Sequence, residues 1–185
     1  MKKDLTYLVT ISLVLVACGI FVTSGCSQPV KTLDPAVKGP QLIVNPDTVR
    51  LGVAKMKDTK LIFSGSGLEP DDSVFIKLLN VPVDGKKMDL AIASADVRKD
   101  GTFDATVGLL TKVSDFLRAK IGSNEKMENI IIITQPPMPA GTYTAQAVSM
   151  LSDKKADCVL NVKEPSWIDR LKDWLGVKMG KIVRK

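Results

Sequence analysis

Apolar and polar residues alternate in short runs through the middle of the chain, from about residue 41 to residue 163. Phe103, Ala105 and Val107 take every second position with polar neighbours between them, and a second run of this kind starts at Tyr143. A period of two places one set of side chains on a buried face and the other in water. The pattern predicts strands at 42–44, 49–53, 61–63, 74–79, 90–95, 102–107, 130–134, 142–148 and 156–162.

Frequent turn signals separate these runs, so we expect a mainly β fold, an antiparallel β-sandwich of seven to nine strands. One short helix interrupts it. Val113, Phe116, Leu117 and Ile121 recur at helical spacing, and the run ends at Gly122. The segment is thus predicted to be a short inserted helix.

Residues 164–185 are predicted to form an amphipathic, basic C-terminal helix and tail. The side chain of Ser166 can cap the first turn, and the side chain of Asp169, three residues later, can accept a hydrogen bond from the Ser166 N–H in return. Gly176 and Gly180 weaken the second half, which predicts an end near Leu175. The apolar positions that fall in one arc are Trp167, Ile168, Leu171, Trp174, Leu175, Met179 and Ile182. This stripe can pack on the β domain, lie on a membrane surface, or dock on a partner protein.

The N-terminus has the pattern of an export signal. Lys2 and Lys3 precede an apolar run over 5–22, and small residues then lead to Cys26. The end of this segment resembles the lipobox of bacterial lipoproteins, which implies a signal peptide over 1–25, a lipid on Cys26 and a linker over 26–40. Two acyl chains would tether the folded part firmly to a membrane.

Two alternatives remain for this segment. Cys18 follows Leu15, Val16 and Ala17, which fit the usual lipobox consensus better. Cleavage before Cys18 would, however, leave apolar residues at the N-terminus of the mature protein. An uncleaved membrane anchor is the other alternative. All of them place the remainder outside the cytoplasm. By resemblance, a serine after Cys26 favours the outer membrane or cell surface over the inner membrane.

The charge distribution speaks against nucleic acid as a partner. The formal net charge is +6, but residues 167–185 hold six basic and two acidic side chains, whereas residues 27–166 hold 18 basic and 17 acidic ones. A nucleic-acid-binding domain would show a basic face on its folded body. Only the C-terminal tail of this chain is basic.

The sequence has no histidine, which excludes most nucleophilic triads and most zinc, copper and non-haem iron sites. Cys158 alternates with Ala156, Leu160 and Val162, so it is predicted to be a core residue and not a nucleophile. We therefore expect no enzymatic activity and no cofactor.

Carboxylates in the loops are the remaining candidates for a chemical site. Asp71, Asp72, Asp96 and Asp100 lie in turn-like segments and define an alternative ligand-binding role. Asp96, Asp100 and Asp104 are a weaker alternative, a calcium site, since their spacing of four differs from that of an EF-hand loop.

Several short sequence motifs, in their order along the chain, resemble bacterial surface Ig-like domains related to the IPT/TIG group. They are residues 63–74, the Asp-Gly-Thr-Phe phrase at 100–103, the Pro-Ala-Gly-Thr-Tyr phrase at 139–143 and a closing strand to Val162. The resemblance covers 41–163 and implies a binding or spacing module without catalytic residues. The segment 112–129 departs from it as an insertion.

From these patterns we expect a noncatalytic, membrane-tethered Ig-like module of the bacterial cell envelope, acting in adhesion, scaffolding or partner binding. One alternative is an accessory subunit of a membrane complex that docks through the C-terminal helix, with Trp167, Leu171 and Trp174 in contact. The other is a ligand- or calcium-binding protein that uses the loop carboxylates.

Overall fold

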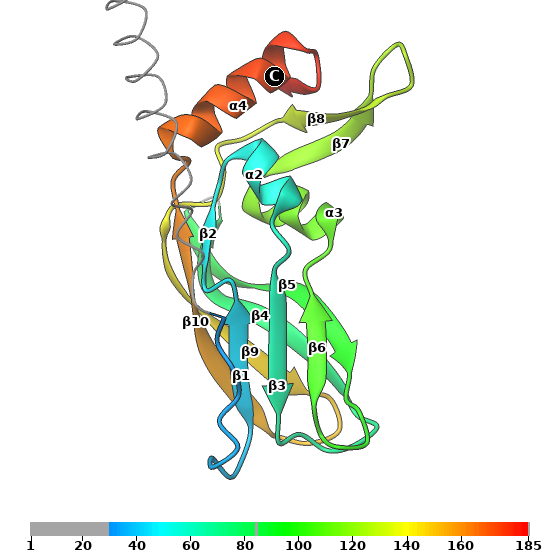
Figure 1. Cartoon of the computed structure of the whole chain (residues 1–185), viewed down its shortest axis with the longest axis vertical. Coiled ribbons are helices and arrows are strands. Elements are labelled where there is room, and N and C mark those ends of the chain that lie inside the picture. Colours follow the sequence, from blue (N-terminus) through cyan, green and yellow to red (C-terminus); the bar gives the residue numbers. More distant parts are fainter. Residues whose placement is uncertain (1–29, 84, 185) are drawn as a thin grey trace, which may run out of the picture.

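The computed structural model describes residues 30–83 and 85–184, and over these ranges the fold is mainly β (Figure 1). The predicted signal segment 1–25 and both Cys18 and Cys26 lie outside the described residues. Within them, no helix is long and apolar enough to cross a membrane.

Two sheets form the lower part of the molecule (Figure 1). The first has three antiparallel strands in the order β1-β3-β6, which are β1 (Gln41–Asn45), β3 (Ile62–Ser66) and β6 (Phe103–Thr106). The second has the order β2-β10-β9-β4-β5, with β2 (Thr48–Arg50), β4 (Ser73–Val83), β5 (Lys86–Asp96), β9 (Gly141–Ser149) and β10 (Lys155–Lys163). Its pairs are antiparallel except β2 with β10.

The core lies between these two sheets. Phe63 and Phe103 from the first sheet and Ile76, Ala145 and Leu160 from the second are buried in one apolar cluster. The alternation in the sequence therefore reports which side chains face inward, and all nine predicted strand segments coincide with or overlap observed strands.

A smaller third sheet and three helices gather at the upper end (Figure 1). The sheet has the order β11-β8-β7, with β7 (Ala119–Ser123), β8 (Asn129–Ile133) and β11 (Ile182–Arg184). The helices are α2 (Val53–Asp58), α3 (Leu109–Thr111), which continues as a π-helical turn over Lys112–Phe116, and α4 (Trp167–Lys178).

The inserted helix is shorter than predicted. It ends at Phe116, because Arg118 adopts a φ of 48° that turns the chain out of the helix. Ile121, which fitted the helical spacing, lies instead in β7 opposite Ile131 of β8. The insertion 112–129 therefore contributes to a hairpin as well as a helical turn.

Two further predictions at the upper end are corrected. The strand predicted over 49–53 stops at Arg50, and Val53 begins α2. Helix α4 continues past Leu175 to Lys178, and Gly176 lies within it at a position where the side chain of Ile182 packs closely. Strands β7 and β11 were not predicted from the pattern.

The described part of the predicted linker is held against the body. The N–H of Lys31 donates to the side chain of Asn45 at 2.9 Å, and the Asn45 amide donates back to the Lys31 carbonyl at 2.9 Å. Gln41 similarly bonds the backbone of Asp34 and Val37. Side chains of β1 thus hold parts of the segment 31–40 beside the first sheet.

Candidate functional site

Helix α4 begins where the sequence predicts. The hydroxyl of Ser166 accepts from the N–H of Asp169, and the Asp169 carboxylate accepts from the Ser166 N–H at 2.9 Å, which completes a capping box. Burial acts to raise the pKa of Asp169, but the hydrogen bonds from Ser166 and nearby basic side chains outweigh it, so the pKa lies below its usual value. The cap is therefore ionised at neutral pH.

The buried side of α4 is polar and small instead of apolar. Its buried residues are Asp169, Asp173 and Gly176. The Asp173 carboxylate accepts from the N–H groups of Val53 and Ala54, both at 3.0 Å, so it caps the first turn of α2. Helix α4 thus packs on the domain through hydrogen bonds to a neighbouring helix and through a glycine contact.

The apolar side of α4 faces outward. Trp167 is 74% exposed and Trp174 is 54% exposed, and the other exposed apolar residues of the helix are Ile168, Leu171, Leu175 and Val177. The packing of this stripe on the β domain, one of three interpretations of the sequence, is therefore wrong. Asp169 and Asp173 point inward to cap helix ends, which leaves the opposite face without a partner in the part of the chain that the structure describes.

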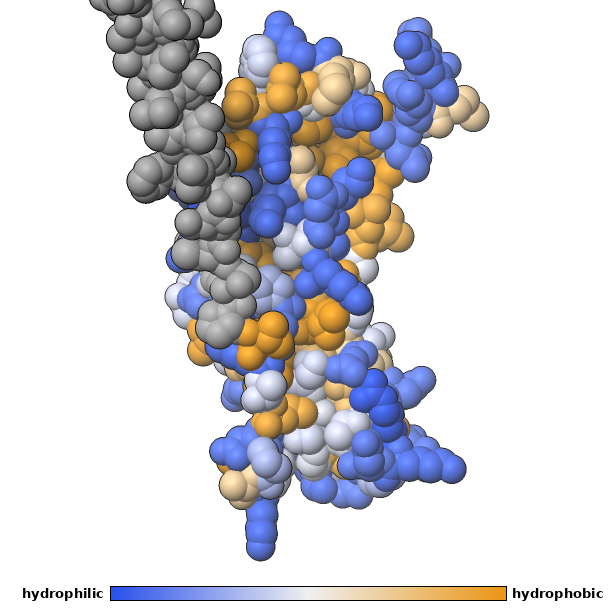
Figure 2. All heavy atoms as spheres, viewed as in Figure 1, coloured by the Kyte–Doolittle hydropathy of each residue, from blue (hydrophilic) through white to orange (hydrophobic). Residues whose placement is uncertain are grey.

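This outward face has a defined shape and charge. At 3.6 residues per turn, Trp174, Trp167, Leu171, Leu175 and Ile168 span an arc of about 120°. Basic residues lie beside it, and the ammonium of Lys178 lies 5.8 Å from the ring centroid of Trp174. Figure 2 shows hydrophobic residues gathered over the upper half of the molecule, while its lower end is largely hydrophilic.

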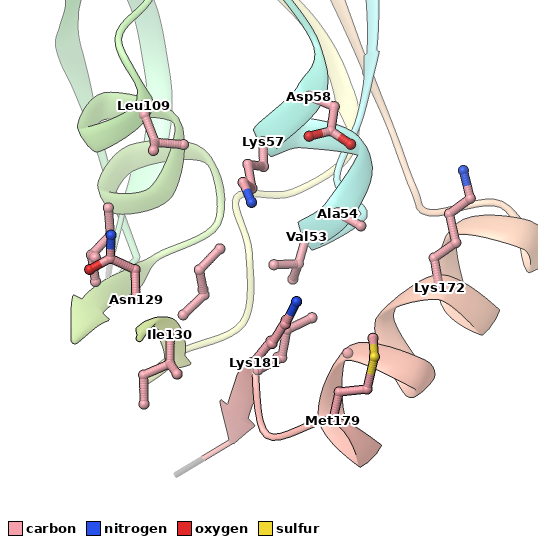
Figure 3. Close-up of a pocket in the computed structure, with 14 residues that line it drawn as sticks. Val53, Ala54, Lys57, Asp58, Leu109, Asn129, Ile130, Lys172, Met179 and Lys181 are labelled. Carbon is pink, nitrogen blue, oxygen red and sulfur yellow. The ribbon is translucent and has the colours of Figure 1, made fainter. Parts of the chain in front are cut away.

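Of the last two residues that the sequence placed in this stripe, Ile182 does not join it, whereas Met179 is 61% exposed just beyond the helix. Ile182 lies in β11 and is buried against Gly176. Met179 follows the helix and lines a cavity of about 290 Å³ between α2, α3, the β7–β8 hairpin, α4 and β11 (Figure 3). Sequence reasoning missed this cavity, since five separate segments form it and no single one carries its pattern.

The loop carboxylates do not line this cavity, and Asp72 and Asp96 lie close together, since both accept hydrogen bonds from Ser73. Asp72 is 1% exposed and accepts from the Ser149 hydroxyl, from Ser73 N–H at 2.6 Å and from Leu151 N–H at 3.2 Å. Burial acts to raise the pKa of Asp72, but these hydrogen bonds bring it below its usual value. Asp72 thus holds two loops together, and nothing in this geometry supports the loop-carboxylate ligand site.

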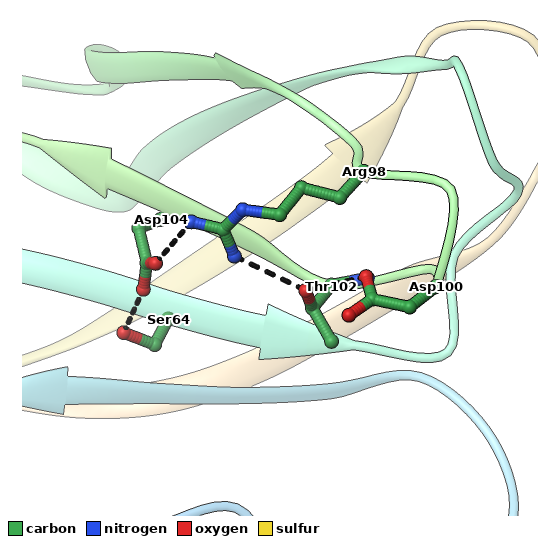
Figure 4. Close-up of polar contacts among 5 residues, drawn as sticks. All are labelled: Ser64, Arg98, Asp100, Thr102 and Asp104. Atoms are coloured by element: carbon green, nitrogen blue, oxygen red, sulfur yellow. Dashed lines mark hydrogen bonds and ion pairs between the residues drawn. The ribbon is translucent and has the colours of Figure 1, made fainter.

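The three candidate calcium ligands have other partners, and Figure 4 shows those of Asp100 and Asp104. Asp104 accepts from Ser64 at 2.6 Å and pairs with Arg98, Asp100 accepts from Thr102 N–H at 3.0 Å, and Asp96 accepts from Ser73. The pKa of Asp104 is lowered first by the hydrogen bond from Ser64 and then by the one from Arg98. Among residues 30–83 and 85–184 no group of three His, Cys, Asp or Glu side chains could hold a metal ion.

Cys158 lies on β10, half-buried against the core. Burial raises the pKa of its thiol to about 12, so the thiolate is scarce at neutral pH. Its alternate neighbours Ala156, Leu160 and Val162 are buried, as the sequence pattern predicts.

Comparisons with known proteins add little to this geometry. No family model matches the chain, and no curated protein matches it. Among solved structures, the chain is similar to a beta-glucosidase from Listeria innocua in complex with glucose, at 12% sequence identity and a TM-score of 0.34. The likeness covers 76% of this chain and 20% of that one, so the chain spans about a fifth of the enzyme it matches.

Proposed function

We propose that the protein is a noncatalytic, lipid-tethered Ig-like module of a bacterial cell envelope, which rests on the membrane through the outward face of α4. The observation that carries this proposal is the inverted packing of α4, with Asp173 buried and Trp167 and Trp174 exposed. Exposed tryptophan and leucine with flanking basic residues are typical of helices that lie in a membrane interface.

The basic residues are placed to support such contact. Arg170 and Lys172 lie on either side of the apolar arc of α4, and Lys178 follows at its C-terminal end. Lysine and arginine side chains at these positions can reach anionic head groups while their stems cover apolar surface. The ion pair of Arg170 with Glu164, at 3.3 Å, is exposed and therefore weak.

The position of Lys31, near the start of the described chain, supports a tether on the α4 side of the domain. The ammonium of Lys31 lies 2.8 Å from the Asp47 carboxylate, and the Asp47 carbonyl accepts from Asn161 N–H at 2.8 Å. Trp167 begins α4 six residues after Asn161. Four residues separate Cys26 from Lys31, and the five residue steps between them span at most about 18 Å. A lipid on Cys26 would therefore bring this end of the domain to the bilayer.

The Ig-like assignment is supported by the closing strands. The Tyr143 hydroxyl donates to the carbonyl of Pro139 at 2.7 Å, four residues upstream, as the tyrosine corner of Ig-like domains does. Strands β9 and β10 then pair antiparallel from Gly141 to Val148, as the closing hairpin of such a domain would.

The other end of the molecule is the surface we propose for adhesion or scaffolding. The turns after β3, β5 and β9 lie at the lower end, away from α4 (Figure 1). They are fixed to one another, since Asp72 binds the turn after β9 and Lys154 pairs with Glu69 at 2.6 Å. A rigid set of loops pointing away from the membrane suits recognition of an envelope component.

The test uses the two tryptophans, the only ones in the chain, because both lie on α4. The full-length protein is reconstituted in vesicles that contain acidic lipid and phospholipid brominated at known depths. Interfacial helices reach roughly 5–10 Å into the head-group boundary, so bromine near the head groups should quench tryptophan emission more strongly than bromine at the chain ends. Unquenched emission at all depths would sink the membrane contact.

Two variants make this test specific. Leu171→Glu keeps both tryptophans but places a charge on the apolar arc, and should strongly reduce the quenching. Leu151→Glu is the matched control, because Leu151 is 79% exposed in the turn after β9 at the opposite end. If neither variant alters quenching but Trp174→Glu abolishes copurification of an envelope protein, the accessory-subunit alternative replaces the membrane surface.

A further inference from the structure

The cavity beside α4 combines apolar walls with a basic opening. Val53, Leu109, Ile121 and Ile182 contribute apolar surface from α2, α3, β7 and β11. Its volume of about 290 Å³ lies at the lower end of the range of small-molecule sites, about 300–1,000 Å³. A narrow, mostly apolar ligand fits this space better than a sugar or a nucleotide.

The charged residues of the cavity are three lysines and one aspartate. Figure 3 shows the amines of Lys57 and Lys181 pointing toward the cavity from opposite sides of Val53, while Lys172 extends along the α4 edge. Over residues 30–83 and 85–184, none of these three lysines takes part in a salt bridge. Unpaired ammonium groups above an apolar floor are complementary to an anionic head group on an aliphatic chain.

The cavity is continuous with the surface proposed to contact the membrane. Lys172 and Met179 line it and also belong to α4 and its C-terminal end. A molecule leaving the bilayer beside α4 would meet Lys172 first and the apolar lining next.

We propose that this cavity binds the acyl chain of a single-chain anionic lipid supplied by the bilayer, with Lys57 and Lys181 holding its head group. The supply of ligand from the bilayer rests on the proposed function, whereas the binding chemistry rests on the cavity alone.

The experiment uses the full-length protein in phosphatidylcholine vesicles and a medium-chain fatty acid that carries a diazirine on its chain. After photolysis, mass spectrometry identifies the labelled peptides. We expect labels on α2, α3 and residues 179–182. The fatty alcohol of the same chain, which lacks the charge, should label these peptides far less.

Charge reversal at the cavity provides the second arm. The double variant Lys57→Glu with Lys181→Glu should lower labelling by the fatty acid about tenfold, since two favourable charges become repulsive. The matched control, Lys38→Glu with Lys99→Glu, changes the same net charge at exposed positions outside the cavity and should label normally.

Equal labelling by acid and alcohol, labels confined to the outward face of α4, or an unaffected cavity variant would each overturn the proposal. Tryptophan quenching in the vesicles with acidic and brominated lipid separates the two hypotheses. Cavity labelling without quenching would refute the membrane contact and retain the lipid site, and quenching without cavity labelling would do the reverse.

Discussion

At the scale of single residues, buried acidic side chains are structural and the exposed apolar ones are the functional candidates. Asp72, Asp169 and Asp173 are nearly inaccessible, and each carboxylate accepts backbone hydrogen bonds from a turn or a helix start. Burial of an ionised carboxylate is tolerated only with such partners. Sequence reasoning noticed Asp72 as a site candidate, but its partners show that it joins two loops.

Asp72→Asn tests this role through the pH dependence of stability. Because the folded pKa is below the ordinary 3.8, the ionised carboxylate stabilises the fold above that pH, and this stabilisation is lost as pH falls through 3.8 and below. The variant should lose about 1–3 kcal/mol of unfolding free energy at pH 7, and the difference from wild type should shrink below pH 3.8. Urea unfolding at several pH values measures it.

Asp71→Asn serves as the control, since Asp71 is exposed and asparagine tolerates its φ of 60°. A stability difference for Asp72→Asn that stays constant from pH 7 to pH 3 would contradict the role assigned to the ionised carboxylate.

At the scale of elements, helix α4 is the one whose orientation gives the molecule its candidate site. Its amphipathic pattern alone is equally compatible with burial of the tryptophans. The choice depends on Asp173, which caps α2, and on Gly176, whose lack of a side chain lets Ile182 approach. Both contacts fix the polar side of α4 inward.

Asp173→Ala tests this orientation. The N–H groups of Val53 and Ala54 would lose their acceptor, so the free energy of unfolding should fall by about 1–3 kcal/mol. For a domain of this size, Tm falls by about 2–4 °C for each kcal/mol lost. Hydrogen exchange of the α2 amides should accelerate more than that of β9. Asp153→Ala, at an exposed turn position, should change neither measurement. Unchanged exchange in α2 would show that the cap does not hold the helices together.

At the scale of the whole molecule, the described chain has two unlike ends. Helix α4, the small third sheet and the basic cavity lie at one end, and a set of turns joined by hydrogen bonds lies at the other (Figure 1). The domain between them is a β core that spaces the two. This difference between the two ends suits a protein that is bound to a surface at one end and meets partners at the other.

Intact mass of the protein extracted from its native membrane tests the tether. We expect cleavage before Cys26 together with added acyl mass. Cys26→Ala should abolish both changes, whereas Cys18→Ala should leave them in place, because only one cysteine can become the mature N-terminus. An unmodified full-length mass would support the uncleaved anchor instead, and loss of acylation in Cys18→Ala would move the lipid to that residue.

The sequence by itself determined the local structure of the β body. Alternation at positions such as 103–107 and 143–147 reports burial directly, since neighbouring side chains in a strand face opposite sides. The start of α4 was equally readable, because Ser166 and Asp169 form their cap within four residues. These features depend on contacts near in sequence or on a strict period.

Only the tertiary structure decided which side of α4 faces outward, that residues 119–123 form a strand, and that five segments enclose a cavity. Asp173 meets Val53 across 120 positions of the chain, and Ile121 pairs with Ile131 only because Arg118 leaves the helical conformation. The spacing of apolar residues along a helix predicts that one face is apolar, but it does not predict what packs against that face. That outcome depends on distant hydrogen bonds, which compete with apolar burial and here prevail.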